Sequence, residues 1–364
     1  MGFGRYAAQL QTSALANGMG HRFRLDSRTM STAPRITVLM TLYNKGPYVE
    51  EAVRSVLAQT FTDFELLVVD DASTDGGLKR VKAIHDPRIR ILESAVNSGR
   101  ADAANRGYEA ARGTYIAVLD ADDLMLPERL AKQAAFLDAH PEVGAVGAWA
   151  KAFGATDTLI TFPASDSGAR GQMLFGMPVL YGASMLRGSL LREDGIRSPK
   201  GWLFPGEDRL FMLELGRHCQ FANLQEVLLR YRTGEQNQRH GRDGVSDMHH
   251  LYRAVFRQLG FEVTEEQIRL QTFLHDLGGP PPTVAQVLAL GRWVRELKAR
   301  NRKAGVLPVA AFEAQLTKRW ESVFHRVVTQ DAWAALLHMV LTGKVRERMG
   351  YWGTHTKRRW LGLC

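Results

Sequence analysis

Three carboxylates lie within four positions of the chain, at Asp120, Asp122 and Asp123, and a short loop with this spacing can bind a metal ion. Carboxylates so close together repel one another unless a cation or a hydrogen-bond donor lies among them. Their hard oxygen atoms favour Mg²⁺ or Mn²⁺, and Mg²⁺ commonly takes one or two carboxylates together with substrate phosphates. The alternative is a solvated loop in which Asp122 or Asp123 caps the following helix. The place of the loop in the fold decides between the two interpretations.

A second pair of carboxylates, Glu207 and Asp208, stands at the start of a predicted helix that runs to about residue 217. An alcohol is a poor nucleophile, and a carboxylate within hydrogen-bond distance can remove its proton as it attacks. The alternative is that both acids only complement the helix dipole.

The elements that must position these acids alternate between strand and helix over residues 35–149. Short apolar segments with β-branched residues predict four strands, and segments with helical spacing lie between them. This alternation predicts an α/β fold with a mostly parallel sheet flanked by helices. The predicted strands are 36–40, 64–69, 88–92 and 115–119, and the predicted helices are 48–57, 78–84 and 100–111.

Polar residues follow three of these strands, at the edge where a parallel sheet binds its ligands. The segment Thr41-Leu42-Tyr43-Asn44 follows the first strand, Asp70-Asp71 the second, and the acidic cluster the fourth. We therefore expect these side chains to surround one crevice, which favours the metal-binding interpretation. The first strand is followed by neither a Gly-x-Gly-x-x-Gly turn nor a Gly-Lys-Ser/Thr phosphate loop, which argues against the usual dinucleotide and P-loop sites.

As a set, these motifs resemble the family-2 glycosyltransferases, which have the GT-A fold. The resemblance covers roughly residues 35–235, more weakly after residue 150, and motif order and spacing both agree. It implies a GT-A sheet with a Rossmann-like nucleotide-binding half. The matching segments are VLMTLYN at 38–44, AQTF at 58–61, VVDDASTD at 68–75, NSG at 97–99, NRG at 105–107 and LDADD at 119–123.

The resemblance also implies a nucleotide-binding set. Thr41, Leu42 and Tyr43 would hold the nucleotide base, with Tyr43 stacked on it. Asp71 would accept a hydrogen bond from a pyrimidine such as uracil, and Arg100 would contact phosphate or base.

The remaining implied roles concern the metal and the reaction. Asp120 would face the ribose, and Asp122 would bind the Mn²⁺ or Mg²⁺ that bridges the diphosphate. The catalytic base would be Asp208, with Glu207 as the near alternative. Segment 177–187 resembles the acceptor side of the family site, and 229–232 resembles its closing Tyr-Arg element. Relatives often have a His after that element, where this chain has Thr233; His240 is a weak substitute.

Composition bounds the class of protein. The 364 residues are 45% hydrophobic and 23% charged, as in globular proteins with a sizeable core. The formal net charge of +9 favours an anionic partner. The two cysteines, Cys219 and Cys364, exclude a disulfide framework and favour a reducing compartment, the cytoplasm. The uncharged stretch at 171–186 is too short for a membrane span.

The two ends of the chain differ from its body. Residues 1–33 are predicted to be a disordered extension, 34–240 a GT-A domain, and 245–364 a mainly helical region. Between residues 343 and 364, six basic residues oppose one acid, and Tyr351, Trp352 and Trp360 are interleaved. Such a tail suits an anionic membrane surface; the alternative is a solvated face whose aromatics pack on the fold. Because no nucleic-acid-binding motif accompanies the charge, we expect no nucleic-acid partner.

These inferences predict a metal-dependent, inverting glycosyltransferase of the hexosyltransferase type. The expected donor is a nucleotide-sugar, UDP-linked. The expected acceptor is a hydroxyl of a glycan or lipid-linked molecule in cell-surface polysaccharide synthesis, with peripheral contact at the inner face of the cytoplasmic membrane. Two alternatives stay open. Intact Asp122 and Asp208 argue against an inactive scaffold that binds a nucleotide-sugar. The lack of a Gly-rich basic loop after the first strand argues against a nucleotidyltransferase on a similar sheet.

Overall fold

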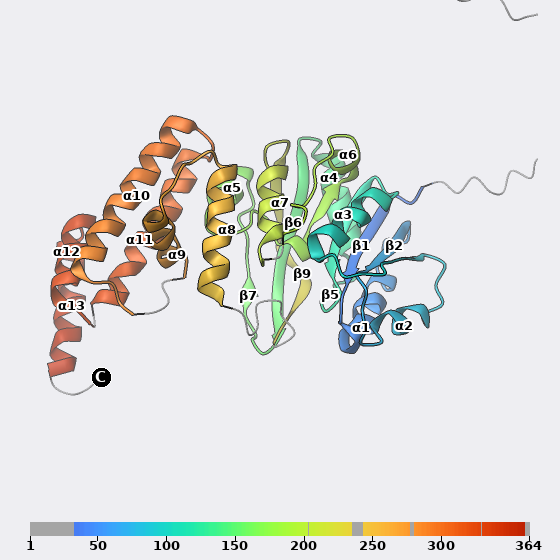
Figure 1. Ribbon diagram of the computed structural model, residues 1–364, viewed down its shortest axis with the longest axis horizontal. Helices are drawn as coiled ribbons and strands as arrows, with labels where there is room; N and C mark the ends of the chain where they lie inside the picture. Colours follow the sequence, from blue (N-terminus) through green and yellow to red (C-terminus); the bar gives the residue numbers. More distant parts are fainter. Residues whose placement is uncertain (1–32, 203, 235–242, 277–279, 329, 361–364) are drawn as a thin grey trace, which may run out of the picture. The chain divides into compact units, whose positions relative to one another are not determined.

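The structure, a computed structural model, describes residues 33–202, 204–234, 243–276, 280–328 and 330–360. The chain from Pro34 onward forms one compact unit, in which an α/β region precedes a helical region (Figure 1). The predicted N-terminal extension lies outside the described residues except for Ala33.

The first four large strands form the parallel part of one sheet. β1 (Ile36–Leu42) lies between β2 (Phe64–Asp70) and β4 (Tyr115–Asp120), and β3 (Ile89–Glu93) pairs with β2. The connecting helices are α1 (Gly46–Leu57), α2 (Gly77–Lys82) and α3 (Arg100–Ala110). The predicted strands and helices of this region are confirmed, and the α/β fold with them.

Beyond β4 the sheet becomes mixed. The strand order is β3-β2-β1-β4-β8-β6-β9-β5, and β7 pairs with β6. β8 runs antiparallel to both neighbours, whereas β9 runs parallel to β6. The shortest strands have only two or three residues, too few for a hydrophobic pattern to predict them. The bounds are β5 (Leu124–Met125), β6 (Val143–Gly154), β7 (Leu159–Ile160), β8 (Met185–Arg187) and β9 (Gln220–Thr233).

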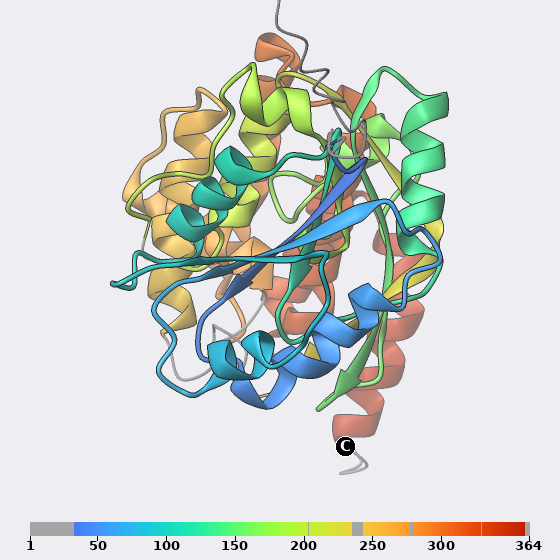
Figure 2. The same cartoon turned by 90° about the vertical axis from the view of Figure 1, so that its right-hand side faces the viewer.

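Alternate residues of the parallel strands face two different cores. On β1, Val38 and Met40 pack with α1 and α4 (Arg129–Ala139) on one face, whereas Leu39 packs with α3 on the other. Figure 2 shows α3 and α7 on one side of the strands and α4 on the other. The elements that join the α3 side are α5 (Asp166–Gly171), α6 (Gly188–Arg192) and α7 (Glu207–Leu215). Because both faces are covered, polar side chains gather at the open carboxyl edge of the parallel strands.

The C-terminal region is helical, as predicted. Its residues share the core on the α3 side of the sheet, with α8 against α7 and α11 against α5. Among the described residues, no helix combines the length and the apolar character that a membrane span requires. The helices are α8 (Gly244–Gln258), α9 (Glu265–Asp276), α10 (Val284–Ala304), α11 (Val309–Val327), α12 (Ala332–Thr342) and α13 (Val345–Trp360). The predicted boundary near residue 240, together with His240, lies outside the described residues.

Candidate active site

The carboxyl ends of the parallel strands and the start of α7 surround a cavity of about 850 Å³. The residues that the sequence assigned to nucleotide binding, metal binding or catalysis all line this cavity, although they come from distant parts of the chain. Their proximity is a finding of the structure, and their roles stay predictions. They are Thr41, Leu42, Tyr43, Asp71, Arg100, Asp120, Asp122, Glu207 and Asp208.

The turn after β1 presents Tyr43 to the cavity with 47% of its surface exposed. Asn44 follows it in the left-handed conformation, with φ of 50°, and asparagine tolerates this region better than most residues. Its Oδ1 accepts a hydrogen bond of 2.9 Å from the Thr74 amide, and Asp75 accepts one of 2.6 Å from the Gly46 amide. These bonds join the loops that follow β1 and β2, so the wall that carries Tyr43 is held in place.

Asp71 is buried and accepts several hydrogen bonds within the protein. Its carboxylate accepts from the Ser98 hydroxyl at 2.8 Å, the Gly99 amide at 2.8 Å and Arg106 Nη2 at 2.9 Å. The loop before α3 is thereby fixed against the end of β2. The implied hydrogen bond from a nucleotide base would have to share a carboxylate that already has these donors.

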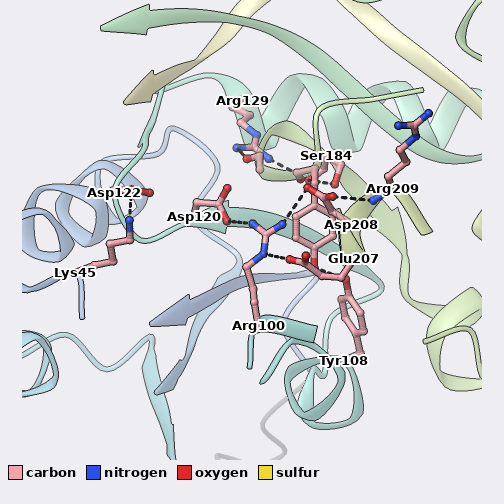
Figure 3. Close-up of polar contacts among 12 residues, drawn as sticks. Lys45, Arg100, Tyr108, Asp120, Asp122, Arg129, Ser184, Glu207, Asp208 and Arg209 are labelled. Atoms are coloured by element: carbon pink, nitrogen blue, oxygen red, sulfur yellow. Dashed lines mark hydrogen bonds and ion pairs between the residues drawn. The ribbon is translucent and has the colours of Figure 1, made fainter. Parts of the chain in front are cut away.

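Arg100 is the hub of a charged cluster on the cavity wall (Figure 3). Its Nη2 lies 2.9 Å from Asp208 Oδ2, its Nη1 lies 3.3 Å from Asp120 Oδ1, and its Nε donates to Glu207. Burial lowers the pKa of the Arg100 guanidinium, but the three carboxylates outweigh burial and hold it well above its usual range. The ring of Tyr181 lies beneath the guanidinium, 5.4 Å from it. One arginine thus links α3, the end of β4 and the start of α7.

The two acids of α7 differ in their access to the cavity. The Asp208 side chain is 21% exposed, whereas that of Glu207 is 5% exposed. Gly206 precedes them with φ of 103°, and an added Cβ would lie 2.7 Å from Leu251 Cδ2, so only glycine fits there. This turn places the first residues of α7 at the cavity, and Asp208 is the more accessible of the two candidate bases.

The acidic loop after β4 contains three carboxylates with different surroundings. Asp122 Oδ2 lies 2.6 Å from Lys45 Nζ. Burial raises the pKa of Asp120, against the opposing charge of Arg100, and the Asp122 charge adds to the rise. Burial likewise raises the pKa of Asp123 well above its usual value, reinforced by the charges of Asp120 and Asp122. Asp123 faces inward, where its Oδ1 accepts 2.7 Å from the Arg232 amide. Asp120 and Asp122 therefore form the part of the cluster that faces the cavity.

A buried arginine lies behind this loop. Arg129, at the start of α4, is fully buried and donates to the carbonyl oxygens of Gly182 and Val118 at 2.8 Å and of Ser184 at 3.0 Å. Burial lowers its pKa to about 9, while the charges of Asp123 and Asp120 oppose the fall. Arg129 joins the strand that leads into the acidic loop to the 3-10 turn at Tyr181–Ala183, which borders the cavity.

The donor set of the cavity fits a divalent cation. Within the described part of the chain, its lining includes five carboxylates, from Asp71, Asp120, Asp122, Glu207 and Asp208, and two basic side chains, from Lys45 and Arg100. A diphosphate that entered would add further negative charge, which a Mg²⁺ or Mn²⁺ ion would balance. The described residues do not form a ready cluster of three or more metal-ligating side chains. Asp122, with Asp120 beside it, would therefore hold the ion together with phosphate oxygens.

Several residues that line or support the cavity were not predicted from the sequence. Lys45 directly follows the Tyr43-Asn44 motif, and Tyr181 lies in the segment assigned to the acceptor side, yet neither received a role. Tyr181 hydrogen bonds through its hydroxyl to that of Tyr108 at 2.6 Å. The position of Lys45 directly after an aromatic motif, in a chain with an acidic cluster, could have indicated a role for it. The hydrogen bonds of Arg129 to main-chain carbonyls are not detectable in the sequence.

The chain is similar in sequence to a known protein family and to several of its members. Residues 37–176 match the family described as Glycosyl transferase family 2. EpsE of Bacillus subtilis (strain 168), a protein named as a glycosyltransferase, is 33% identical over 215 residues, which are 56% of this chain and 74% of that protein. The succinoglycan biosynthesis protein ExoO of Rhizobium meliloti (strain 1021) is 42% identical over 106 residues, 29% of this chain and 30% of that protein.

Solved structures show the same fold at low sequence identity. The crystal structure of residues 1–349 of S. aureus TarS in complex with UDP-GlcNAc superposes with a TM-score of 0.56 at 18% identity, over 87% of this chain and 92% of that one. The mannosyltransferase PcManGT from Pyrobaculum calidifontis, in complex with GDP-Man and Mn²⁺, gives a TM-score of 0.51 at 21% identity, over 87% and 89% of the two chains. Both the long match to EpsE and the family match thus lead to one assignment: the chain is a glycosyltransferase of family 2, with the GT-A fold.

Proposed function

We propose that this chain transfers a hexosyl group from a UDP-sugar to a hydroxyl of a glycan or lipid-linked acceptor in polysaccharide synthesis, with inversion at the anomeric carbon. The observation that carries this proposal is one shared cavity, lined by the exposed ring of Tyr43, the carboxylate of Asp122 and the accessible carboxylate of Asp208. Its volume of about 850 Å³ suits a small-molecule ligand, since such sites are typically ~300–1,000 Å³.

The proposed donor is a nucleotide-sugar whose base binds to the part of the cavity wall that follows β1. Tyr43 would stack on the base, and the segment from Thr41 would lie along its edge. The TarS complex with UDP-GlcNAc supports a uridine donor, and the GDP-Man complex makes a guanosine donor the alternative to test. Competition of UDP and GDP for the wild-type cavity, measured by calorimetry, decides between them.

The reaction follows from the position of Asp208. Its carboxylate would accept the proton of an acceptor hydroxyl as that oxygen attacks the anomeric carbon of the donor. The bond between that carbon and the diphosphate oxygen breaks in the same step, and the diphosphate leaves from the opposite face. A single displacement of this kind inverts the anomeric centre, so an α-linked donor would give a β-linked product.

The departing diphosphate carries the developing negative charge. A divalent cation held at Asp122 would, when bound, neutralise part of that charge. Arg100 adds a fixed positive charge on the same wall, and its bonds to Glu207 and Asp208 orient the start of α7. The buried Glu207 would then serve mainly to hold Arg100, which leaves Asp208 as the base.

A substitution series tests this assignment. Asp208→Asn should reduce turnover by about 10²–10⁴-fold, the usual contribution of a general base, while the affinity for UDP stays within about twofold. Glu214→Gln on the same helix, whose side chain is 34% exposed and contacts Arg217, is the matched control and should keep full turnover. Full turnover in Asp208→Asn would contradict the base assignment. If the wild type bound the donor but formed no product, the inactive-scaffold alternative would be favoured. Nuclear magnetic resonance of the product shows whether the anomeric configuration is inverted.

We also propose that the C-terminal helices contact an anionic membrane surface. Residues 332–342 of α12 contain no Asp, Glu, Lys or Arg, and its outer face leaves Trp333 74% and Val340 59% exposed. The excess of basic residues that follows, from Lys344 onward, complements anionic lipid. Part of that predicted tail, residues 361–364, lies outside the described residues.

Vesicle flotation tests the membrane proposal. The wild type should float with vesicles that contain phosphatidylglycerol and should remain unbound when the vesicles are purely zwitterionic. A variant with Trp333→Ser and Val340→Ser should lose most of this binding, whereas Val284→Ser on α10, also at an exposed valine, should not. Equal flotation of both variants would contradict a role for the α12 face.

A further inference from the structure

Lys45 and Asp122 form an ion pair on the cavity wall, separate from the Arg100 cluster (Figure 3). Their Nζ and Oδ2 atoms are 2.6 Å apart, and the two side chains are only 22% and 10% exposed. Asp122 is also the residue to which the proposed function gives a divalent cation. The same carboxylate thus has a resident cation of the chain itself.

The main chain of Lys45 is fixed on both sides. Its carbonyl accepts hydrogen bonds of 2.9 Å from the Tyr48 and Val49 amides at the start of α1. On the other side, Asn44 is bonded to the loop after β2, and the Gly46 amide is bonded to Asp75. The backbone therefore holds Lys45 beside Asp122, so a change of ion-pair partner would involve the side chain and not the main chain.

A lysine ammonium and a divalent cation compete at such a carboxylate. Mg²⁺ binds oxygen at ~2.1 Å, and at that distance its charge would repel an ammonium group held by the same carboxylate. A diphosphate changes this balance because its oxygens accept hydrogen bonds from the ammonium and also coordinate the metal. The lysine side chain has length enough to swing between neighbouring anions, since it is a flexible four-carbon stem.

We propose that Lys45 is the counter-ion of Asp122 in the donor-free protein and that it transfers to the diphosphate when nucleotide and metal bind together. This inference rests on the proposed function, since it assigns a further residue to the nucleoside-diphosphate and divalent-cation site. It makes metal binding conditional on the nucleotide: without a diphosphate, Lys45 occupies Asp122 and the ion binds weakly. Such coupling is reciprocal, so each ligand raises the affinity for the other by the same factor.

The test measures Mn²⁺ and UDP binding separately on the full chain. Electron paramagnetic resonance reports free Mn²⁺, and calorimetry reports UDP. Lys45→Met removes the charge and keeps most of the side-chain volume. It should bind Mn²⁺ without UDP about tenfold more tightly than the wild type, and should bind UDP in saturating Mn²⁺ about tenfold more weakly, within the usual range of coupling between sites. Lys79→Met, at an exposed lysine of α2, is the control and should change neither affinity.

The opposite signs of the two effects separate this role from damage to the fold, which would weaken both ligands. Lys45→Gln provides a second neutral variant if Lys45→Met does not fold by circular dichroism. Equal Mn²⁺ affinity of wild type and neutral variant, in a protein that binds UDP, would overturn the inference and leave the proposed function intact. Failure of the wild type to bind UDP or GDP with Mn²⁺ would overturn the proposed function, and the comparison with Mn²⁺ alone would still decide whether Lys45 competes at Asp122.

Discussion

Replacement of Arg129 by methionine should destabilise the fold and loosen the cavity together. The guanidinium is fully buried and donates to three main-chain carbonyls, so Arg129→Met leaves the oxygens of Gly182 and Val118 without these donors. Ser184 keeps one partner, since its oxygen also accepts 2.9 Å from the Val118 amide. Methionine fills similar space, so the loss of polar contacts, rather than an empty cavity, dominates the effect.

The expected magnitude follows from these contacts. A hydrogen bond to a charged group contributes ~1.5–3 kcal/mol, and two carbonyls lose their charged donor entirely. The variant regains the desolvation free energy of a buried guanidinium, but Asp120 and Asp123 lose a nearby positive charge. We therefore expect a net loss of ~3–5 kcal/mol from the free energy of unfolding, a large part of the ~5–15 kcal/mol typical of folded proteins.

Urea unfolding followed by circular dichroism measures this loss. Arg302→Met is the matched control, because the solvent-exposed Arg302 forms an ion pair with Glu313, and its removal should leave the free energy of unfolding nearly unchanged. Arg129→Lys keeps the charge but not the planar fork, so its loss should lie between the two. An Arg129→Met variant as stable as Arg302→Met would contradict this prediction, because the buried guanidinium would then contribute nothing to stability.

Three further predictions concern stability and nucleotide binding. Burial lowers the pKa of His338 to about 4, so the contribution of the neutral imidazole to stability is complete above pH 6.5 and is lost as the pH falls through 4, by up to ~3 kcal/mol. In His338→Gln, the free energy of unfolding in urea should therefore depend less on pH between pH 7 and 4.5. An unchanged pH dependence would contradict this prediction. Burial raises the pKa of Glu65, but hydrogen bonds from Arg112 and Arg90 outweigh it and hold the pKa at about 2. The resulting stabilisation is complete above pH 4.5 and disappears as the pH falls through 2. In the same assay, Glu65→Gln should therefore lower the free energy of unfolding by ~2–3 kcal/mol at pH 7 and by almost nothing near pH 2. A loss of stability that does not depend on pH would indicate a packing effect instead. Tyr43→Ala should weaken UDP binding by about 5- to 150-fold in calorimetry, because stacking contributes ~1–3 kcal/mol per base. The unfolding midpoint of this variant should stay unchanged. An affinity for UDP equal to that of the wild type would rule out stacking on Tyr43.

The sequence alone predicted the parallel half of the fold and the location of the site. Strands buried on both faces carry continuous apolar runs, and the carboxyl ends of parallel strands meet at one edge. For this reason Tyr43, Asp71 and Asp122 could be expected at one crevice. The mixed half of the sheet escaped prediction because β5, β7 and β8 are so short that neighbouring strands, and not their own residues, determine them.

The charges that meet inside that crevice could not be predicted, because they come together through long-range contacts. Asp122 pairs with a lysine 77 positions earlier, and Arg100 joins acids that lie more than 100 positions later in the chain. Local periodicity reports which face of an element is buried, and it carries no information on pairs formed when distant loops close on one another. Burial then determines the electrostatics. In an extended chain the same side chains would be solvated, whereas on the described part of the cavity wall Arg100 and Lys45 lie among five carboxylates with less water around them.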